Sequence, residues 1–114
     1  MQFLIIGKDG TDAWAGERRN AVREKHLRLG DQMEASGDRW YGCAIMDDHG
    51  KMTGSMAILD FPSKEKLQDY LKKEPYILGK VWKTIEVYNC NVKNPWKFNR
   101  PKSFFEKRGY QKIT

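Results

Sequence analysis

The sequence predicts a single α+β domain whose elements follow the order β-α-β-β-α-β. Three observations support this order. An apolar run opens the chain at residues 2–7, and a long stretch with helical spacing of apolar side chains follows at residues 17–36. Two strand-like segments then flank a turn rich in Asp and Gly. The length of 114 residues fits one domain.

The first predicted strand, residues 2–7, is apolar on both of its faces. Residues 3–6 read FLII, so alternate side chains on either side of the strand are hydrophobic. We therefore expect this strand to be central in the sheet and covered on both faces. Because one layer of helices covers only one face, the second face needs a partner sheet, and the sequence predicts a homodimer formed through that face.

The first predicted helix, residues 17–36, presents one apolar face and ends at Gly37. The residues at offsets of four, three and four on that face are Val22, His26, Leu29 and Met33. His26 is therefore expected to point from the helix toward the sheet, whereas the arginines of this helix are expected largely on other faces, where water can solvate them.

The rest of the chain supplies the hairpin, the second helix and the last strand. Strands are expected at residues 39–46 and 51–61, on either side of the DDHG turn. A helix follows at residues 64–72 with Ser63 as its N-cap, and the last strand spans residues 80–92. The whole pattern predicts a ferredoxin-like fold, with a four-stranded antiparallel sheet and two helices on one face.

The positive charge lies at the carboxyl end of the chain. The net charge is +6, and residues 93–114 account for all of it. We therefore divide the chain into a domain at residues 1–93 and a basic extension at residues 94–114. The aromatic residues of the extension are Trp96, Phe98, Phe104, Phe105 and Tyr110. Because so much apolar surface is costly to leave in water, we expect the extension to pack on this protein or its dimer partner rather than on nucleic acid.

Several other classes of protein are disfavoured. The longest apolar runs are far shorter than the ~20 residues of a membrane span. The opening residues lack the features of a signal peptide, and the two cysteines, Cys43 and Cys90, do not belong to a paired motif, so we expect a cytoplasmic protein with reduced thiols. Neither metal-ligand spacing nor a Gly-rich phosphate loop occurs, and no metal or cofactor is expected.

His26 is the candidate for chemistry, because a half-buried imidazole can act as a general base near neutral pH. Such a base needs a carboxylate on its other ring nitrogen. Asp12, Asp60 and Glu74 are each candidates for that carboxylate, and periodicity does not choose among them. The other histidine, His49, lies in the predicted turn.

Residues 17–27, ERRNAVREKHL, resemble the helix of the YCII-related family, which carries an R-x-A-V-R-x-x-H-L pattern. The resemblance extends over about residues 1–92. Its other matches are Gly42, Gly54-Ser55 with the acid Asp60, and Glu74-Pro75-Tyr76, where the family has Asp-Pro-Tyr. It implies a dimeric α/β barrel whose active site pairs the helix histidine, His26, with the carboxylate at position 74, here a glutamate that is one methylene longer.

The resemblance favours an enzyme without a cofactor that acts on a small molecule by general acid–base chemistry. A dehydrochlorinase-like member suggests lyase or hydrolase-like chemistry on a hydroxylated aromatic compound. His26 and Glu74 would be catalytic, and the expected substrate-binding residues are Arg19, Arg23, Tyr76, Trp82 and Asp60. The alternative is a non-catalytic binding or assembly subunit whose extension docks a partner.

Overall fold

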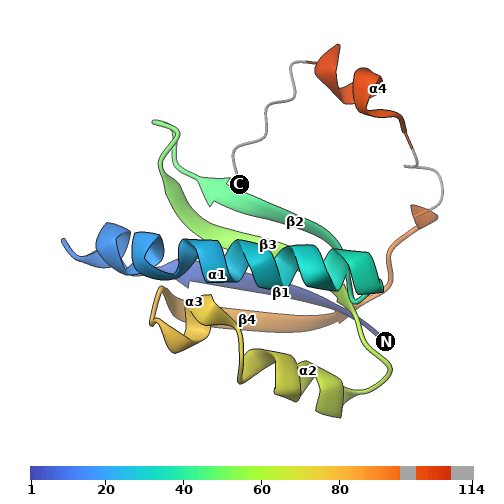
Figure 1. The fold of residues 1–114 in the computed structure, drawn as a ribbon, viewed down its shortest axis with the longest axis horizontal. Coiled ribbons are helices and arrows are strands. Elements are labelled where there is room, and N and C mark those ends of the chain that lie inside the picture. The colour runs from blue at the N-terminus through green and yellow to red at the C-terminus, as the bar shows by residue number, and fades with distance from the viewer. Residues whose placement is uncertain (96–99, 109–114) are drawn as a thin grey trace.

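A computed structural model describes residues 1–95 and 100–108 of the chain (Figure 1). The strands and the two long helices follow the predicted order, and two short helices are added. The strands are β1 (Gln2–Asp9), β2 (Arg39–Met46), β3 (Met52–Asp60) and β4 (Trp82–Cys90). The helices are α1 (Ala15–Ser36), α2 (Lys64–Leu71), α3 (Pro75–Leu78) and α4 (Lys102–Glu106).

Several boundaries differ from the prediction, and two of the differences have a local reason. α1 begins two residues early, because the Asp12 carboxylate accepts a hydrogen bond from the Trp14 N–H (3.2 Å) and the Asp12 carbonyl accepts one from Ala15 (3.2 Å). β4 begins two residues late, because Lys80 has a φ of 55° and cannot be part of an extended strand. Shortly before Lys80 the chain forms α3, a short helix that the predicted order did not include.

The sheet has the order β2-β3-β1-β4, and each pair of neighbouring strands is antiparallel. This is the ferredoxin-like arrangement that the sequence predicts, with β1 at the centre. In Figure 1, α1, α2 and α3 all lie over one face of the sheet. The core fills the space between this face and the helices. Its fully buried members include Phe3, Ile5, Leu59, Tyr76 and Val81.

The opposite face of the sheet carries a second set of apolar side chains. Leu4 is aligned with Ile58 on one side and with Tyr88 on the other, and Ile6 is aligned with Met56. Paired residues of an antiparallel sheet point to the same face, so these side chains are neighbours. Within the described residues no helix covers this face (Figure 1), and the partner sheet stays a prediction.

The end of β4 leads into the C-terminal extension. The Val92 N–H donates to Gln2 Oε1 (2.7 Å), and Pro95 lines a shallow groove beside Trp40. Farther along lies α4, and the guanidinium groups of Arg100 and Arg108, which flank this helix, lie over the Phe104 ring.

The packing of the whole extension stays a prediction, because Trp96, Phe98 and Tyr110 lie outside the described residues. Cys43 and Cys90 are free thiols, as expected. In the part of the chain that the structure describes, no helix is long and apolar enough to cross a membrane.

Candidate active site

The structure brings His26 and Glu74 into contact beneath α1. His26 Nδ1 lies 2.5 Å from Glu74 Oε1, and the two side chains are 13% and 3% exposed. The apolar stripe of α1 turns the imidazole toward the sheet, as its spacing predicts. Glu74 reaches the same point because it is the N-cap of α3, where Pro75 starts the helix. The predicted proximity of the two side chains is thus present, and their catalytic roles remain a prediction.

Besides His26, two groups hold the Glu74 carboxylate in place. Oε1 accepts a hydrogen bond from the Tyr76 backbone N–H (3.0 Å), and Oε2 accepts one from the Tyr70 hydroxyl (2.8 Å). Burial, followed by the negative charge of Glu74, raises the pKa of Tyr70, so the phenol keeps its proton and acts as the donor. An ionised carboxylate can only accept hydrogen bonds, so a neutral His26 that donates to Glu74 must carry its proton on Nδ1, which leaves Nε2 as an acceptor.

Two aromatic rings fix the plane of the imidazole. The Tyr76 ring stacks on His26 with centroids 3.7 Å apart and an interplanar angle of 6°. Trp82 lies edge-on to both rings, and its ring centroid is 6.0 Å from that of His26 and 5.7 Å from that of Tyr76. The indole has room because Gly7 faces it: a methyl group at Gly7 would overlap the Trp82 ring. The imidazole therefore has little freedom to rotate away from Glu74.

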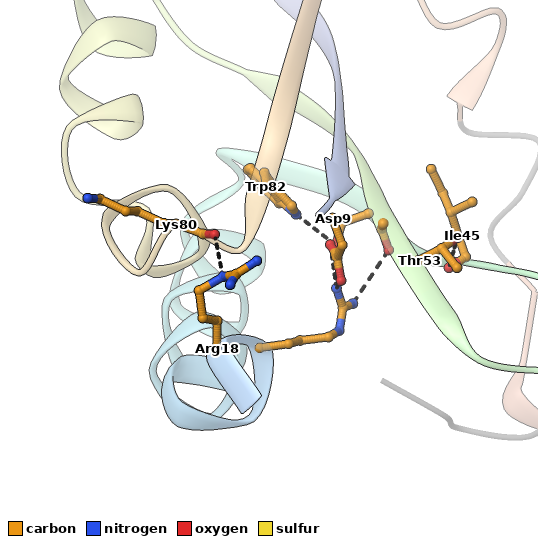
Figure 2. A network of polar contacts seen from close by, with 9 residues as sticks. Asp9, Arg18, Ile45, Thr53, Lys80 and Trp82 are labelled. Carbon is orange, nitrogen blue, oxygen red and sulfur yellow. Dashed lines mark hydrogen bonds and ion pairs between the residues drawn. The ribbon is translucent and has the colours of Figure 1, made fainter. Parts of the chain in front are cut away.

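Arg19 is buried beside these rings, contrary to its expected place on the solvated part of the helix. It donates two hydrogen bonds to the Asp9 carboxylate (3.0 and 2.8 Å) and one to the Gly54 carbonyl (3.4 Å). Its guanidinium also lies 4.8 Å from the centre of the Tyr76 ring. Figure 2 shows Asp9 close to Trp82 at the end of β1. Asp9 was expected in a loop, so the sequence interpretation missed this partner.

A small pocket lies between α1 and the sheet and is partly open to solvent, with a cavity volume of about 40 Å³. The predicted site residues that line it are His26, Arg19, Arg23, Tyr76 and Trp82. Apolar side chains, including Ile5, Leu27 and Ala57, complete the walls. The pocket thus combines aromatic surfaces, guanidinium groups and the imidazole that contacts Glu74.

A comparison with models of protein families identifies the family of this chain. The model of the YCII-related domain matches residues 1–96. The chain belongs to the YCII-related family. No match was found among curated proteins.

One solved structure that shares the fold of this YCII-related domain is the 5-chloro-2-hydroxyhydroquinone dehydrochlorinase of Burkholderia phenoliruptrix AC1100, in complex with 2,5-dihydroxybenzoquinone. It is 20% identical with a TM-score of 0.70, over 82% of this chain and 96% of that one. Rv0793 of Mycobacterium tuberculosis is 9% identical with a TM-score of 0.46, over 82% of this chain and 96% of the other.

The other predicted residues of the YCII-related domain lie away from the pocket. The Asp60 carboxylate is 3.5 Å from the amino group of Met1, at the opposite end of β1. Asp12 forms an exposed ion pair with Arg18 (2.6 Å), and this hydrogen-bonded guanidinium holds the pKa of the Asp12 carboxyl below its usual range. Arg18 also donates to the Lys80 carbonyl, at 3.1 Å (Figure 2). Of the three candidate carboxylates, only Glu74 contacts His26.

Several pocket residues were not among the predicted site residues. The polar ones include Tyr70, Ser55 and Arg39. Tyr70 precedes Glu74 by four residues, a spacing at which a helix and its end bring two side chains together. The Ser55 hydroxyl accepts a hydrogen bond from Trp82 Nε1 (3.4 Å). No cluster of three or more metal-ligating side chains occurs in the residues described.

Proposed function

We propose that this YCII-related domain is a small-molecule enzyme that works without a cofactor, with His26 as its general base and Glu74 as the group that orients it. The observation that carries the proposal is the 2.5 Å contact between His26 Nδ1 and Glu74 Oε1 at the wall of a pocket. A general base held in one tautomer and one orientation contributes about 10²–10⁴-fold to the rate of a proton transfer.

The proton transfer follows from this geometry. With the proton on Nδ1 directed at Glu74, Nε2 accepts a proton from the substrate, and the electron pair of the broken bond stays on the substrate. The imidazolium that forms is stabilised by the adjacent carboxylate, which is itself held by Tyr70 and Tyr76. Return of the proton to the product or to water restores the neutral imidazole.

Hydroxylated aromatic compounds are the substrate class that we infer. Tyr76 and Trp82 offer aromatic surfaces to a planar ring. A ring hydroxyl loses its proton to an imidazole more readily than an aliphatic hydroxyl does. The structural neighbour from Burkholderia acts on a chlorinated hydroxyhydroquinone, which supports a search among such compounds, including a lyase reaction that releases chloride.

The test is a screen of hydroxyhydroquinones, with and without ring chlorine, against the purified chain, following product spectra and chloride release. For any compound that reacts, His26→Gln is expected to lower kcat by about 10²-fold or more. His49→Gln is the matched control, because His49 lies exposed in the β2–β3 turn. Full activity in His26→Gln contradicts the proposal. Binding without turnover across the screen would favour the non-catalytic alternative.

A further inference from the structure

Arg39 occupies an unusual place between α1 and the sheet. It is the first residue of β2, and its guanidinium lies between Gly30 of α1 and Gly42 of β2. A methyl group at Gly30 would overlap Nη1, and one at Gly42 would overlap Nη2. A glycine in the middle of a helix is unfavourable relative to alanine. Gly30 is therefore explained by the space that it leaves for this guanidinium.

The charge of Arg39 is poorly matched within the described residues. Its one counter-charge there is Glu34, whose Oε1 lies 3.5 Å from Nε and whose side chain is 47% exposed. The Arg39 side chain is only 17% exposed, and its buried Nε lacks a hydrogen-bond acceptor. Arg19 Nε is likewise buried without an acceptor, but Arg19 has a buried carboxylate partner, Asp9, with which it forms two hydrogen bonds. A buried guanidinium N–H without an acceptor is costly, and an anion that accepts a hydrogen bond from it would remove that cost.

The pocket is where such an anion would lie. Arg39 lines the same pocket as His26, and its positive charge acts on Tyr70, the residue that holds Glu74. The two nearby carboxylates are already engaged, Asp9 by Arg19 and Glu74 by His26. Arg39 is therefore a positively charged residue of the pocket wall that, within the described residues, has no buried carboxylate as its partner.

We propose that Arg39 is the specificity-determining residue of this pocket, and that it selects aromatic ligands that carry a carboxylate. The planar guanidinium fork matches the two oxygens of a carboxylate, which a neutral substituent such as an alcohol does not. The aromatic part of the ligand would lie against Tyr76 and Trp82, with a ring hydroxyl toward His26. This inference rests on the proposed function for the placement of the hydroxyl, and on Arg39 itself for the placement of the carboxylate.

Two probes that differ in charge test the proposal: 2,5-dihydroxybenzoate and the neutral 2,5-dihydroxybenzyl alcohol, each titrated calorimetrically into the full chain. The wild type is expected to bind the carboxylate at least tenfold more tightly. Arg39→Met is expected to lose this preference while binding the alcohol as before. Equal affinity of the wild type for both probes overturns the proposal, as does an unchanged preference in Arg39→Met.

Gly30→Ala provides a second variant that keeps the charge of the chain. The new methyl group displaces the Arg39 guanidinium, while alanine favours the helix, so the carboxylate preference is expected to fall without loss of thermal stability. Gly16→Ala is the matched control in the same helix, because nothing lies near its Cβ. An unchanged preference in Gly30→Ala contradicts the proposal.

The two proposals can fail separately. His26→Gln is expected to keep the carboxylate preference even where it abolishes turnover. A chain that prefers the carboxylate and turns nothing over overturns the catalytic proposal alone. A chain that turns over a hydroxylated aromatic compound but binds both probes with equal affinity overturns the role of Arg39 alone.

Discussion

Tyr70 and Glu74 are joined by a hydrogen bond of 2.8 Å from the phenol to Oε2, although one residue belongs to α2 and the other caps α3. The phenol thereby holds the carboxylate that in turn orients His26. Tyr70 is 4% exposed and Glu74 2%, so water cannot readily replace either partner. The link between two helices is thus also the support of the candidate base.

Tyr70→Phe tests this support. Removing the hydroxyl leaves a buried carboxylate oxygen short of a donor, so the free energy of unfolding is expected to fall by about 1–3 kcal/mol. Urea denaturation measures the change, with Tyr41→Phe as the control at an exposed position. Equal stability of Tyr70→Phe and the wild type would show that the hydrogen bond contributes nothing.

The same phenol predicts a dependence of stability on alkaline pH. The pKa of Tyr70 is raised above its ordinary value of 10.0, mainly by burial and then by Glu74. The unfolded chain therefore releases this proton first as the pH rises. The stability contributed by the raised pKa is complete below pH 10 and declines above it, by up to about 1.4 kcal/mol per pH unit.

Denaturation of the wild type and Tyr70→Phe at pH 9 and pH 11 measures this effect. The stability difference between the two proteins is expected to shrink at the higher pH. Tyr76, whose pKa is also raised by burial, is present in both proteins and cancels. A difference that stays constant between the two pH values would contradict the prediction.

Asp9→Asn tests the buried ion pair with Arg19. Both side chains are less than a tenth exposed, so loss of the carboxylate leaves a guanidinium buried without its counter-charge. We expect a loss of about 3 kcal/mol in the free energy of unfolding. Asp12→Asn is the control, because its ion pair with Arg18 lies in water and should matter little. A similar small effect for both variants would argue against the pair as a stabilising contact.

The apolar open face of the sheet leads us to propose that two copies pair through it. Ile58 lies in the middle of this face, beside Leu4. Ile58→Glu is expected to convert a dimer into a monomer, because a charge at the centre of an apolar interface is not solvated. Leu78→Glu, at an exposed position on α3, is the control. Sedimentation velocity at micromolar concentration decides, and a wild type that is only monomeric rejects the proposal.

Deletion of residues 94–114 tests the extension. If its aromatic side chains pack on the domain or on the dimer partner, the deletion lowers the melting temperature or weakens the dimer, since each buried large side chain contributes roughly 1.5–3 kcal/mol. Calorimetry and sedimentation of the truncated chain measure both. An unchanged melting temperature together with an unchanged sedimentation profile would leave the extension free to bind nucleic acid or another partner.

The sequence by itself determined the order of the elements and the direction of His26. Both depend on local patterns: the apolar run of β1, the Asp–Gly turn after β2, and the spacing of side chains along α1. Such patterns act over a few residues, so they are visible in the chain before it folds. The start of α3 at Pro75, by contrast, was not predicted.

Only the tertiary structure decided which carboxylate meets His26. Asp12, Asp60 and Glu74 were equivalent by periodicity, and the family resemblance alone favoured Glu74. Packing of α3 against α1 brings Glu74 beneath the imidazole, whereas Asp60 lies at the far end of the sheet. A choice among residues so far apart in sequence depends on how whole elements pack.

Burial of the arginines was also decided by packing. The helical spacing of Arg19 allowed a solvated position, but Asp9 at the end of β1 supplies a counter-charge inside the fold. Arg39 follows a turn, and no feature of the neighbouring sequence predicts its burial. Gly30 of α1 and Gly42 of β2, which lack side chains, leave room for its guanidinium. A charged side chain is buried where the fold provides both a counter-charge and enough room for it. Because these come from residues far apart in sequence, no single segment of the chain predicts the burial.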